Sequence, residues 1–211
     1  GAASGVVSRP EYEWPLAGPQ IDTMRLATTP WRAVFLKALR KGGLAPAFST
    51  DFRRTSLPLA FPDGTTATLA IDLGRLDAPA SHQRAATWAG IAEIEIELRE
   101  GDPRRLVDLA SSLAADLPLA IEPRSKAERG YALADRAADA PSRAGEIVHA
   151  DGATASAAVA AVVAECVRQI ERNTLGFRGT ALRDPEWIHQ MRIAVRRLRS
   201  CIALADGVLA P

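Results

Sequence analysis

Alternating glutamates mark one short segment as a candidate ion-binding surface. Within the run from Ile91 to Arg99, Glu93, Glu95 and Glu97 alternate with branched apolar residues. Residues two apart in a β-strand share a face, so the carboxylates line one face and the apolar residues the other. Such a face is either solvated, which is the commonest meaning of this alternation, or a site for a hard cation. Mg²⁺ and Mn²⁺ prefer carboxylate oxygens and couple them to phosphate.

Basic side chains near this segment could supply the phosphate contacts. Two lie in a strand-like stretch and three around residue 126: Arg53, Arg54, Arg124, Lys126 and Arg129. Acids on such a sheet would bind the metal, and bases would bind phosphate oxygens. If residues 125–133 form a strand, Lys126 and Glu128 share one face, and Arg129 lies on the other unless a bulge intervenes. Structural salt bridges would use the same residues, so composition leaves both interpretations open.

A second cluster is a row of basic residues near the C-terminal end. At about 100° per residue on a helix, four of them form one stripe: His189, Arg192, Arg196 and Arg199. Their spacing of ~5–6 Å is close to the reach that side chains need to touch successive phosphates of a linear polyanion. The alternative is a solvated arginine face. Nucleic acid is disfavoured because no aromatic residues interleave to stack bases.

The same helix has an apolar stripe, which we predict to face the core. It consists of Ile188, Met191, Val195, Leu198 and Ile202. Arg197 lies off the basic stripe by the same arithmetic. Because the apolar stripe needs a partner surface, we expect an unstable or associating C-terminal segment.

Periodicity and turn residues predict the elements that position these groups. A helix starts at Pro30 and ends at Gly42-Gly43, and Asp63-Gly64 is a hairpin turn between two strands. Asp102 and Pro103 begin another helix that ends at Leu117-Pro118. The predicted strands are 51–61, 65–73 and 91–99, with 125–133 as a possible fourth, and the later helices are 154–174 and 185–204. A sheet with helices followed by helices alone indicates two domains of different class.

Composition excludes several classes of protein. The chain has 211 residues, 47% hydrophobic and 24% charged, with a net charge of +1, which is typical of a globular chain of one domain or two small ones. Arginine dominates the basic residues, which suits an anion-binding protein or a GC-rich genome. The two cysteines, Cys166 and Cys201, are expected to be free thiols in a reducing, cytoplasmic setting. No apolar run reaches the ~18 residues of a membrane helix.

Four motifs in order resemble the C-terminal part of a CYTH domain, the triphosphate tunnel metalloenzyme family. They are Phe52-x-Arg54, Ile71-Asp72-x-Gly74, the glutamate strand with Gly101, and Ser125-Lys126-Ala127-Glu128-Arg129-Gly130-Tyr131. The resemblance spans roughly residues 10–133 and implies an antiparallel sheet that forms part of a tunnel, with packed helices, an α+β fold. It implies Mg²⁺ or Mn²⁺ on Glu93, Glu95 and Glu97, and triphosphate on Arg54, Lys126 and Arg129. No residue is assigned as catalytic.

The departure from the family concerns its opening strand. A Glu-x-Glu-x-Lys signature opens the family's tunnel, and no such triplet occurs before residue 93. We therefore expect a truncated tunnel, and no hydrolysis by this chain alone.

The basic row is similar to the signature helix of the CHAD family, His-x-x-Arg-x-x-x-Arg-Arg-x-Arg. CHAD domains are helical bundles that bind inorganic polyphosphate along a basic groove, and they often follow a CYTH domain. The resemblance implies polyphosphate contacts at His189, Arg192, Arg196, Arg197 and Arg199, with only the first helices of the bundle present. We therefore expect a CYTH part at 1–133, a linker at 134–153 and a CHAD part at 154–211. The function expected is polyphosphate binding, and the alternative is a metal-dependent inorganic triphosphatase formed by a complete CYTH domain.

Overall fold

The computed structural model describes residues 15, 18, 22–41, 44–80, 85–137, 139–147, 152–177 and 184–205. The chain divides into two compact units, residues 7–47 and residues 1–6 with 48–211. The described part of the smaller unit holds α1 (Thr23–Leu26) and α2 (Arg32–Arg40). Helix α2 confirms the helix predicted after Pro30. Helix α1 was not predicted, and the side chain of Asp22 caps it by accepting the Met24 and Arg25 N–H groups at 3.0 and 3.1 Å.

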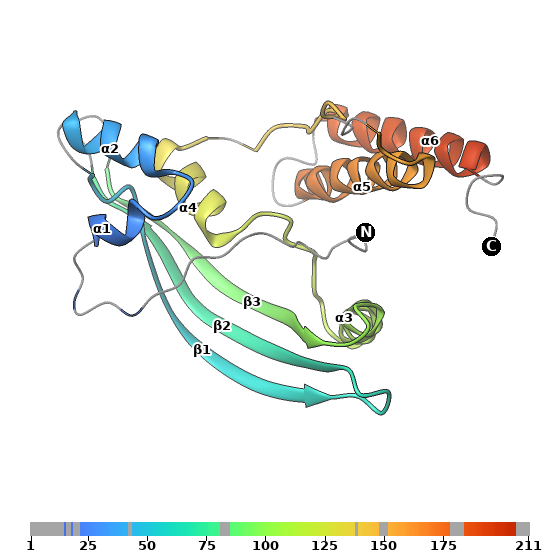
Figure 1. The fold of residues 1–211 in the computed structure, drawn as a ribbon, viewed down its shortest axis with the longest axis horizontal. Coiled ribbons are helices and arrows are strands. Elements are labelled where there is room, and N and C mark those ends of the chain that lie inside the picture. The colour runs from blue at the N-terminus through green and yellow to red at the C-terminus, as the bar shows by residue number, and fades with distance from the viewer. Residues whose placement is uncertain are drawn as a thin grey trace. The chain divides into compact units, whose positions relative to one another are not determined.

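The larger unit contains a curved sheet of three antiparallel strands, in the order β1-β2-β3 (Figure 1). The strands are β1 (Ser49–Ala60), β2 (Thr66–Ala78) and β3 (Thr87–Glu100). All three predicted strands are confirmed, and β2 and β3 are longer than predicted. The predicted hairpin turn is also present, because the Phe61 N–H donates to the Thr65 carbonyl at 2.8 Å and Gly64 has φ +86°.

The register of the strands determines which side chains share a face. Arg54 on β1 pairs with Asp72 on β2, which pairs with Glu93 on β3. These three residues are therefore in line across one face, with Glu95 two residues further along β3. The adjacent Arg53 and the apolar residues between the glutamates lie on the opposite face, as the alternation predicts.

Two helices follow the sheet in the chain. Helix α3 (Arg104–Asp116) begins after Gly101, whose φ of +102° suits only glycine in this turn. The helix starts one residue later than predicted, and Asp102 Oδ1 still accepts the Arg104 N–H at 2.9 Å. Helix α4 (Lys126–Asp135) occupies the range where a fourth strand was considered. That strand is wrong: the segment is helical and packs on β2 and β3.

A capping box explains why residues 126–135 are helical. Ser125 Oγ accepts the Glu128 N–H at 3.1 Å, and Glu128 Oε2 accepts the Ser125 N–H at 2.8 Å. This reciprocal pair satisfies two N–H groups that a helix start otherwise leaves unpaired. On the next turns, Gly130 lies against the ring of Phe48, which also stacks edge-on with Tyr131 at 5.0 Å between centroids. The cap and this packing together fix α4.

Helices α5 (Ala155–Asn173) and α6 (Glu186–Ala205) lie side by side, and a short 3₁₀ turn (Thr174–Phe177) follows α5 (Figure 1). Both predicted C-terminal helices are confirmed. Their contact buries small and aromatic residues, among them Cys166, Trp187 and Ala194. It also buries Gln169, whose Nε2 donates to Gln190 Oε1 at 3.0 Å.

The face of α6 that packs on α5 differs from the predicted one. The predicted core stripe is largely exposed: Ile188, Val195 and Ile202 are 49%, 43% and 55% accessible. Met191 and Leu198 of the same stripe are half-buried. The buried face lies beside this stripe on the helix and consists of Trp187, Gln190, Ala194 and Ala205. The prediction was wrong because it assigned the interface to the large aliphatic residues. In the described structure, the close approach of the helices uses alanine and amide side chains instead.

The predicted linker is partly structured. Helix α4 continues to Asp135, inside the range 134–153. Further along, the Ser142 N–H donates to Asn173 Oδ1 at 3.0 Å, and Asn173 Nδ2 donates to the Ser142 carbonyl at 2.8 Å. Arg168 donates to the Arg143 carbonyl at 3.2 Å. These bonds attach residues 142–143 to α5. None of the helices in the described ranges has the length and apolar character needed to cross a bilayer.

Candidate functional site

Three carboxylates from two strands meet on one face of the sheet. Asp72 on β2 and Glu93 and Glu95 on β3 place one oxygen each within 4.8 Å of one another. The Asp72 side chain has no solvent exposure, and that of Glu93 is only 16% exposed. Three carboxylates this close repel one another unless cations lie between them. The grouping therefore requires positive partners, either from the chain or from solution.

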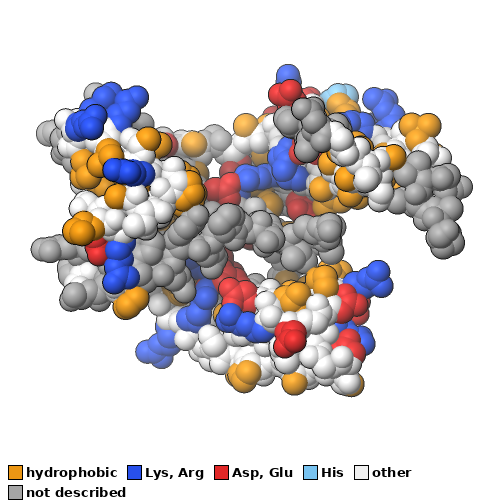
Figure 2. Space-filling model, viewed as in Figure 1, with side chains coloured by type: hydrophobic (Ala, Val, Ile, Leu, Met, Phe, Trp, Pro, Cys, Tyr) orange, Lys and Arg blue, Asp and Glu red, His pale blue; other side chains and the backbone are white. Residues whose placement is uncertain are grey.

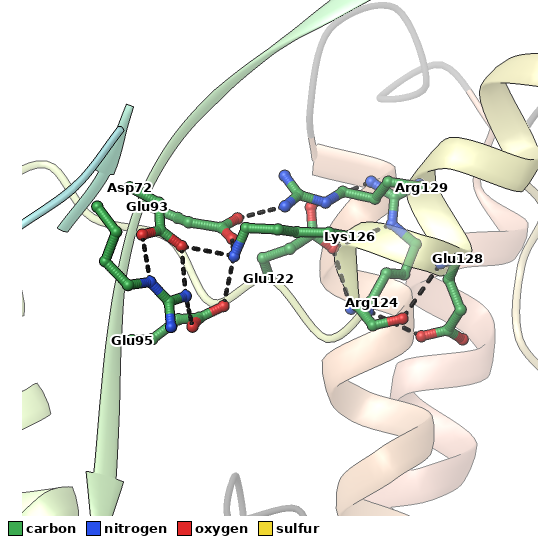
Figure 3. Close-up of polar contacts among 10 residues, drawn as sticks. Asp72, Glu93, Glu95, Glu122, Arg124, Lys126, Glu128 and Arg129 are labelled. Carbon is green, nitrogen blue, oxygen red and sulfur yellow. Dashed lines mark hydrogen bonds and ion pairs between the residues drawn. The ribbon is translucent and has the colours of Figure 1, made fainter. Parts of the chain in front are cut away.

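Arg54 is the first partner of these carboxylates, which Figure 3 labels as Asp72, Glu93 and Glu95. The strand register explains its position. Its Nε and Nη2 donate to the two oxygens of Asp72, both at 2.7 Å, in a bidentate pair. Nη2 also donates to Glu95 Oε2 at 2.5 Å. A planar guanidinium fits a carboxylate in this forked geometry, and would fit two phosphate oxygens in the same way.

Helix α4 supplies the other two cations. Lys126 Nζ lies 2.7 Å from Asp72 Oδ2 and 2.6 Å from Glu95 Oε1, and it also contacts Glu93. Arg129 donates from Nη2 to the other oxygen of Glu93. Because α4 is a helix, Lys126 and Arg129, three residues apart, lie on one face. The predicted separation of these two side chains onto opposite faces is therefore wrong.

An aromatic ring lies beside two of the cations. The ring centroid of Phe52 is 5.0 Å from Lys126 Nζ and 5.7 Å from the Arg54 guanidinium carbon. Phe52 precedes Arg54 by two residues on β1, so both point to the same face. Cations within about 6 Å of a ring face are attracted to it. Phe52 therefore helps to hold both cationic groups at the site.

The ion pairs perturb the titration of the site. Hydrogen bonds from Arg54 and then Lys126 lower the pKa of Asp72 from 3.8 to about 2 against the opposing effect of burial. Burial acts to raise the pKa of Glu95, but Lys126 and Arg54 together lower it. Burial acts to lower the pKa of Lys126, but its three carboxylate partners raise it. Each of these three groups therefore stays charged at neutral pH.

The structure brings together five of the six predicted CYTH-part site residues and adds one that sequence reasoning missed. The missed residue is Asp72. Asp72 is the only acid in the predicted strand 65–73 and belongs to the quoted motif Ile71-Asp72-x-Gly74, which was the available signal. Glu97 lies outside the described cluster: its carboxylate pairs with Arg99 at 2.9 Å and is 55% exposed. Arg124 is also separate, because it is held by Glu122 and Asp139 at 3.0 and 2.6 Å.

The basic row on α6 forms an exposed stripe, as the spacing predicts. Its exposed members are His189, Arg192, Arg196 and Arg199. Figure 2 shows basic side chains and a histidine beside hydrophobic ones over the α5–α6 pair. Arg197 is different: it is half-buried, and its Nη1 has no hydrogen-bond partner among the described residues. Its position off the stripe agrees with the helical arithmetic.

Comparisons with known proteins match two domain families to separate parts of the chain. The CYTH domain model matches residues 1–131, and the CHAD domain model matches residues 161–211. An inorganic triphosphatase from Haemophilus influenzae is 33% identical over 134 residues, which is 63% of this chain and 35% of that protein. The chain thus spans about a third of the length of this curated relative. The sheet with its acidic and basic cluster lies within the CYTH match, and the basic stripe lies within the CHAD match. The chain belongs to the CYTH family, and a CHAD domain follows its CYTH domain.

Proposed function

We propose that the cluster on the sheet binds the phosphate chain of a triphosphate together with a divalent metal ion, as the phosphate site of an inorganic triphosphatase. The observation that supports this most is the meeting of three carboxylates and three cations from β1, β2, β3 and α4. The relative in Haemophilus influenzae is an inorganic triphosphatase by name, and it supports the choice of substrate.

The donor set fits a hard divalent ion. Asp72, Glu93 and Glu95 would be its ligands, because Mg²⁺ and Mn²⁺ take carboxylate oxygens. When bound, such an ion would neutralise phosphate charge and polarise the phosphoryl group. The protein's cations have the complementary role. Arg54, Lys126 and Arg129 would donate to the phosphate oxygens, orient the chain and stabilise its negative charge.

Arg54 and Arg53 provide a matched test of this binding site. They are adjacent on β1 but face opposite sides of the sheet, so only Arg54 lies in the cluster. In calorimetric titrations of tripolyphosphate with Mg²⁺, Arg54→Met should weaken binding about tenfold or more, since a charge-assisted hydrogen bond contributes ~1.5–3 kcal/mol. Arg53→Met should leave the affinity unchanged. Equal losses in the two variants would overturn the proposal and indicate bulk charge.

A second function is proposed for α6. The exposed row of His189, Arg192, Arg196 and Arg199 supports binding of long-chain inorganic polyphosphate, because a linear polyanion can contact successive basic side chains. Arg197 would contribute only through its charge, as its side chain is half-buried.

The test of the second function compares two variants with the same loss of charge. One replaces Arg192, Arg196 and Arg199 by alanine, and the other replaces the exposed Arg32, Lys37 and Arg40 of α2. The first variant should lose salt-sensitive binding of fluorescent polyphosphate, and the second should retain most of it. Retention by the first variant would place the polyphosphate elsewhere.

We also propose the domain division 1–135, 136–153 and 154–211, which extends the first domain to the end of α4. A cytoplasmic location is part of the same proposal, and the free thiols of Cys166 and Cys201 support it.

A further inference from the structure

The three carboxylates of the sheet cluster are already fully paired with cations of the chain. Asp72 is paired with Arg54 and Lys126 at 2.7 Å each. Glu95 is paired with the same two cations at 2.5 and 2.6 Å. Glu93 is paired with Lys126 and Arg129. Three negative and three positive charges give a cluster with no net charge, so it offers no net attraction to a free divalent cation.

Lys126 has the decisive position among these groups. Its ammonium nitrogen contacts all three carboxylates at once, with the Phe52 ring 5.0 Å away. An ion bound by the same three oxygens would need the space that Nζ occupies. Lys126 must therefore leave the carboxylates before a metal ion can use them.

The displaced cations would then lack partners in a partly buried place. The side chains of Lys126 and Arg129 are only 16% and 14% exposed, so water replaces their lost ion pairs poorly. An uncompensated charge in such a site is costly. A phosphate chain removes this cost, because its oxygens can accept the hydrogen bonds that the carboxylates release. Metal and phosphate thus each relieve the penalty that the other creates.

We infer that the site binds the divalent ion and the phosphate chain with positive coupling, and that Lys126 exchanges its carboxylate partners for phosphate oxygens. This inference rests on the proposed triphosphate site and adds an order to it: the metal enters with the phosphate and binds weakly alone. The coupling is reciprocal, so metal also raises the affinity for tripolyphosphate, by about tenfold or more.

The test measures metal binding without any phosphate. The electron paramagnetic resonance signal of free Mn²⁺ is followed as the 211-residue chain is added. Lys126→Met leaves a net charge of −1 on the cluster and frees the space of the ammonium group. This variant should bind Mn²⁺ about tenfold more tightly than the wild type. Lys126→Gln is the second variant, and Lys37→Met on α2, also an exchange of lysine for methionine, is the control that should match the wild type.

The outcomes separate this inference from the proposed function. The inference is overturned if the wild-type chain binds Mn²⁺ as tightly as both Lys126 variants, or if tripolyphosphate binds equally well with EDTA and with Mg²⁺. Circular dichroism spectra confirm that each variant is folded before binding is compared. If tripolyphosphate with Mg²⁺ does not bind the wild-type chain at all, the proposed function itself fails, whatever the Mn²⁺ result.

Discussion

Replacing Asp72 by asparagine removes the buried anion of the sheet cluster while keeping the shape of the side chain. Asp72 has no exposed side-chain surface and accepts three hydrogen bonds from charged groups, two from Arg54 and one from Lys126. Breaking a buried ion pair by removing one partner costs ~3–5 kcal/mol. Arg54 is 40% exposed and keeps Glu95 as a partner, so the loss should lie at the lower end of this range. We therefore expect Asp72→Asn to lower the free energy of unfolding by about 3 kcal/mol.

The assay is urea denaturation followed by circular dichroism, with Asp77→Asn as the control. Asp77 lies on the same strand and pairs with Arg75 at 2.8 Å, but both side chains are partly exposed, at 33% and 61%. An ion pair of this kind contributes less than ~1 kcal/mol. Equal stability losses in the two variants, or none in Asp72→Asn, would refute the claim that Asp72 is the buried centre of the ion-pair network.

Three further predictions concern the same region and use the same denaturation assay. Because the pKa of Asp72 is lowered to about 2 in the folded chain, ionisation of Asp72 adds about 2 kcal/mol to the free energy of unfolding above about pH 4, and this is lost as the pH falls toward 2. The difference in unfolding free energy between the wild type and Asp72→Asn should therefore shrink over that range, and a constant difference would contradict this. Gly130→Ala places a Cβ 2.3 Å from two ring carbons of Phe48. Although alanine favours helices, we expect this overpacking to lower the free energy of unfolding by ~1–2 kcal/mol. Unchanged stability would show that the ring can move aside. Ser125→Ala removes the capping box with Glu128 and should lower the free energy of unfolding by about 1 kcal/mol. No measurable change would mean that packing alone determines where α4 starts.

Strand alternation predicted the sheet face well, because period-two patterns report the side on which a side chain lies. Glu93 and Glu95 were predicted on that basis and lie in the cluster. Alternation did not reveal Asp72, since it is the only acid within the predicted strand 65–73 and a single residue has no period. Its role depends on the register that aligns it with Arg54 and Glu93, which is a long-range property of the fold.

Two of the wrong predictions, the strand at 125–133 and the buried face of α6, had local causes. Residues 125–133 alternate weakly, but Ser125 and Glu128 are spaced as a capping box, and that signal should have outweighed alternation. On α6, the prediction followed the large aliphatic residues, whereas the buried face uses Trp187 and Ala194. Sequence periodicity locates an apolar stripe but does not say which neighbour covers it.

The proposed triphosphate site is tested most directly by a crystal structure of the chain with tripolyphosphate and Mn²⁺, with the metal located by its anomalous scattering. We expect a Mn²⁺ peak bonded to carboxylate oxygens of Asp72, Glu93 and Glu95. Phosphate oxygens should lie within hydrogen-bond distance of Arg54, Lys126 and Arg129. Lys126 should have left the carboxylates. Tripolyphosphate bound away from this face, or a cluster whose ion pairs remain intact beside the bound anion, would contradict this proposal.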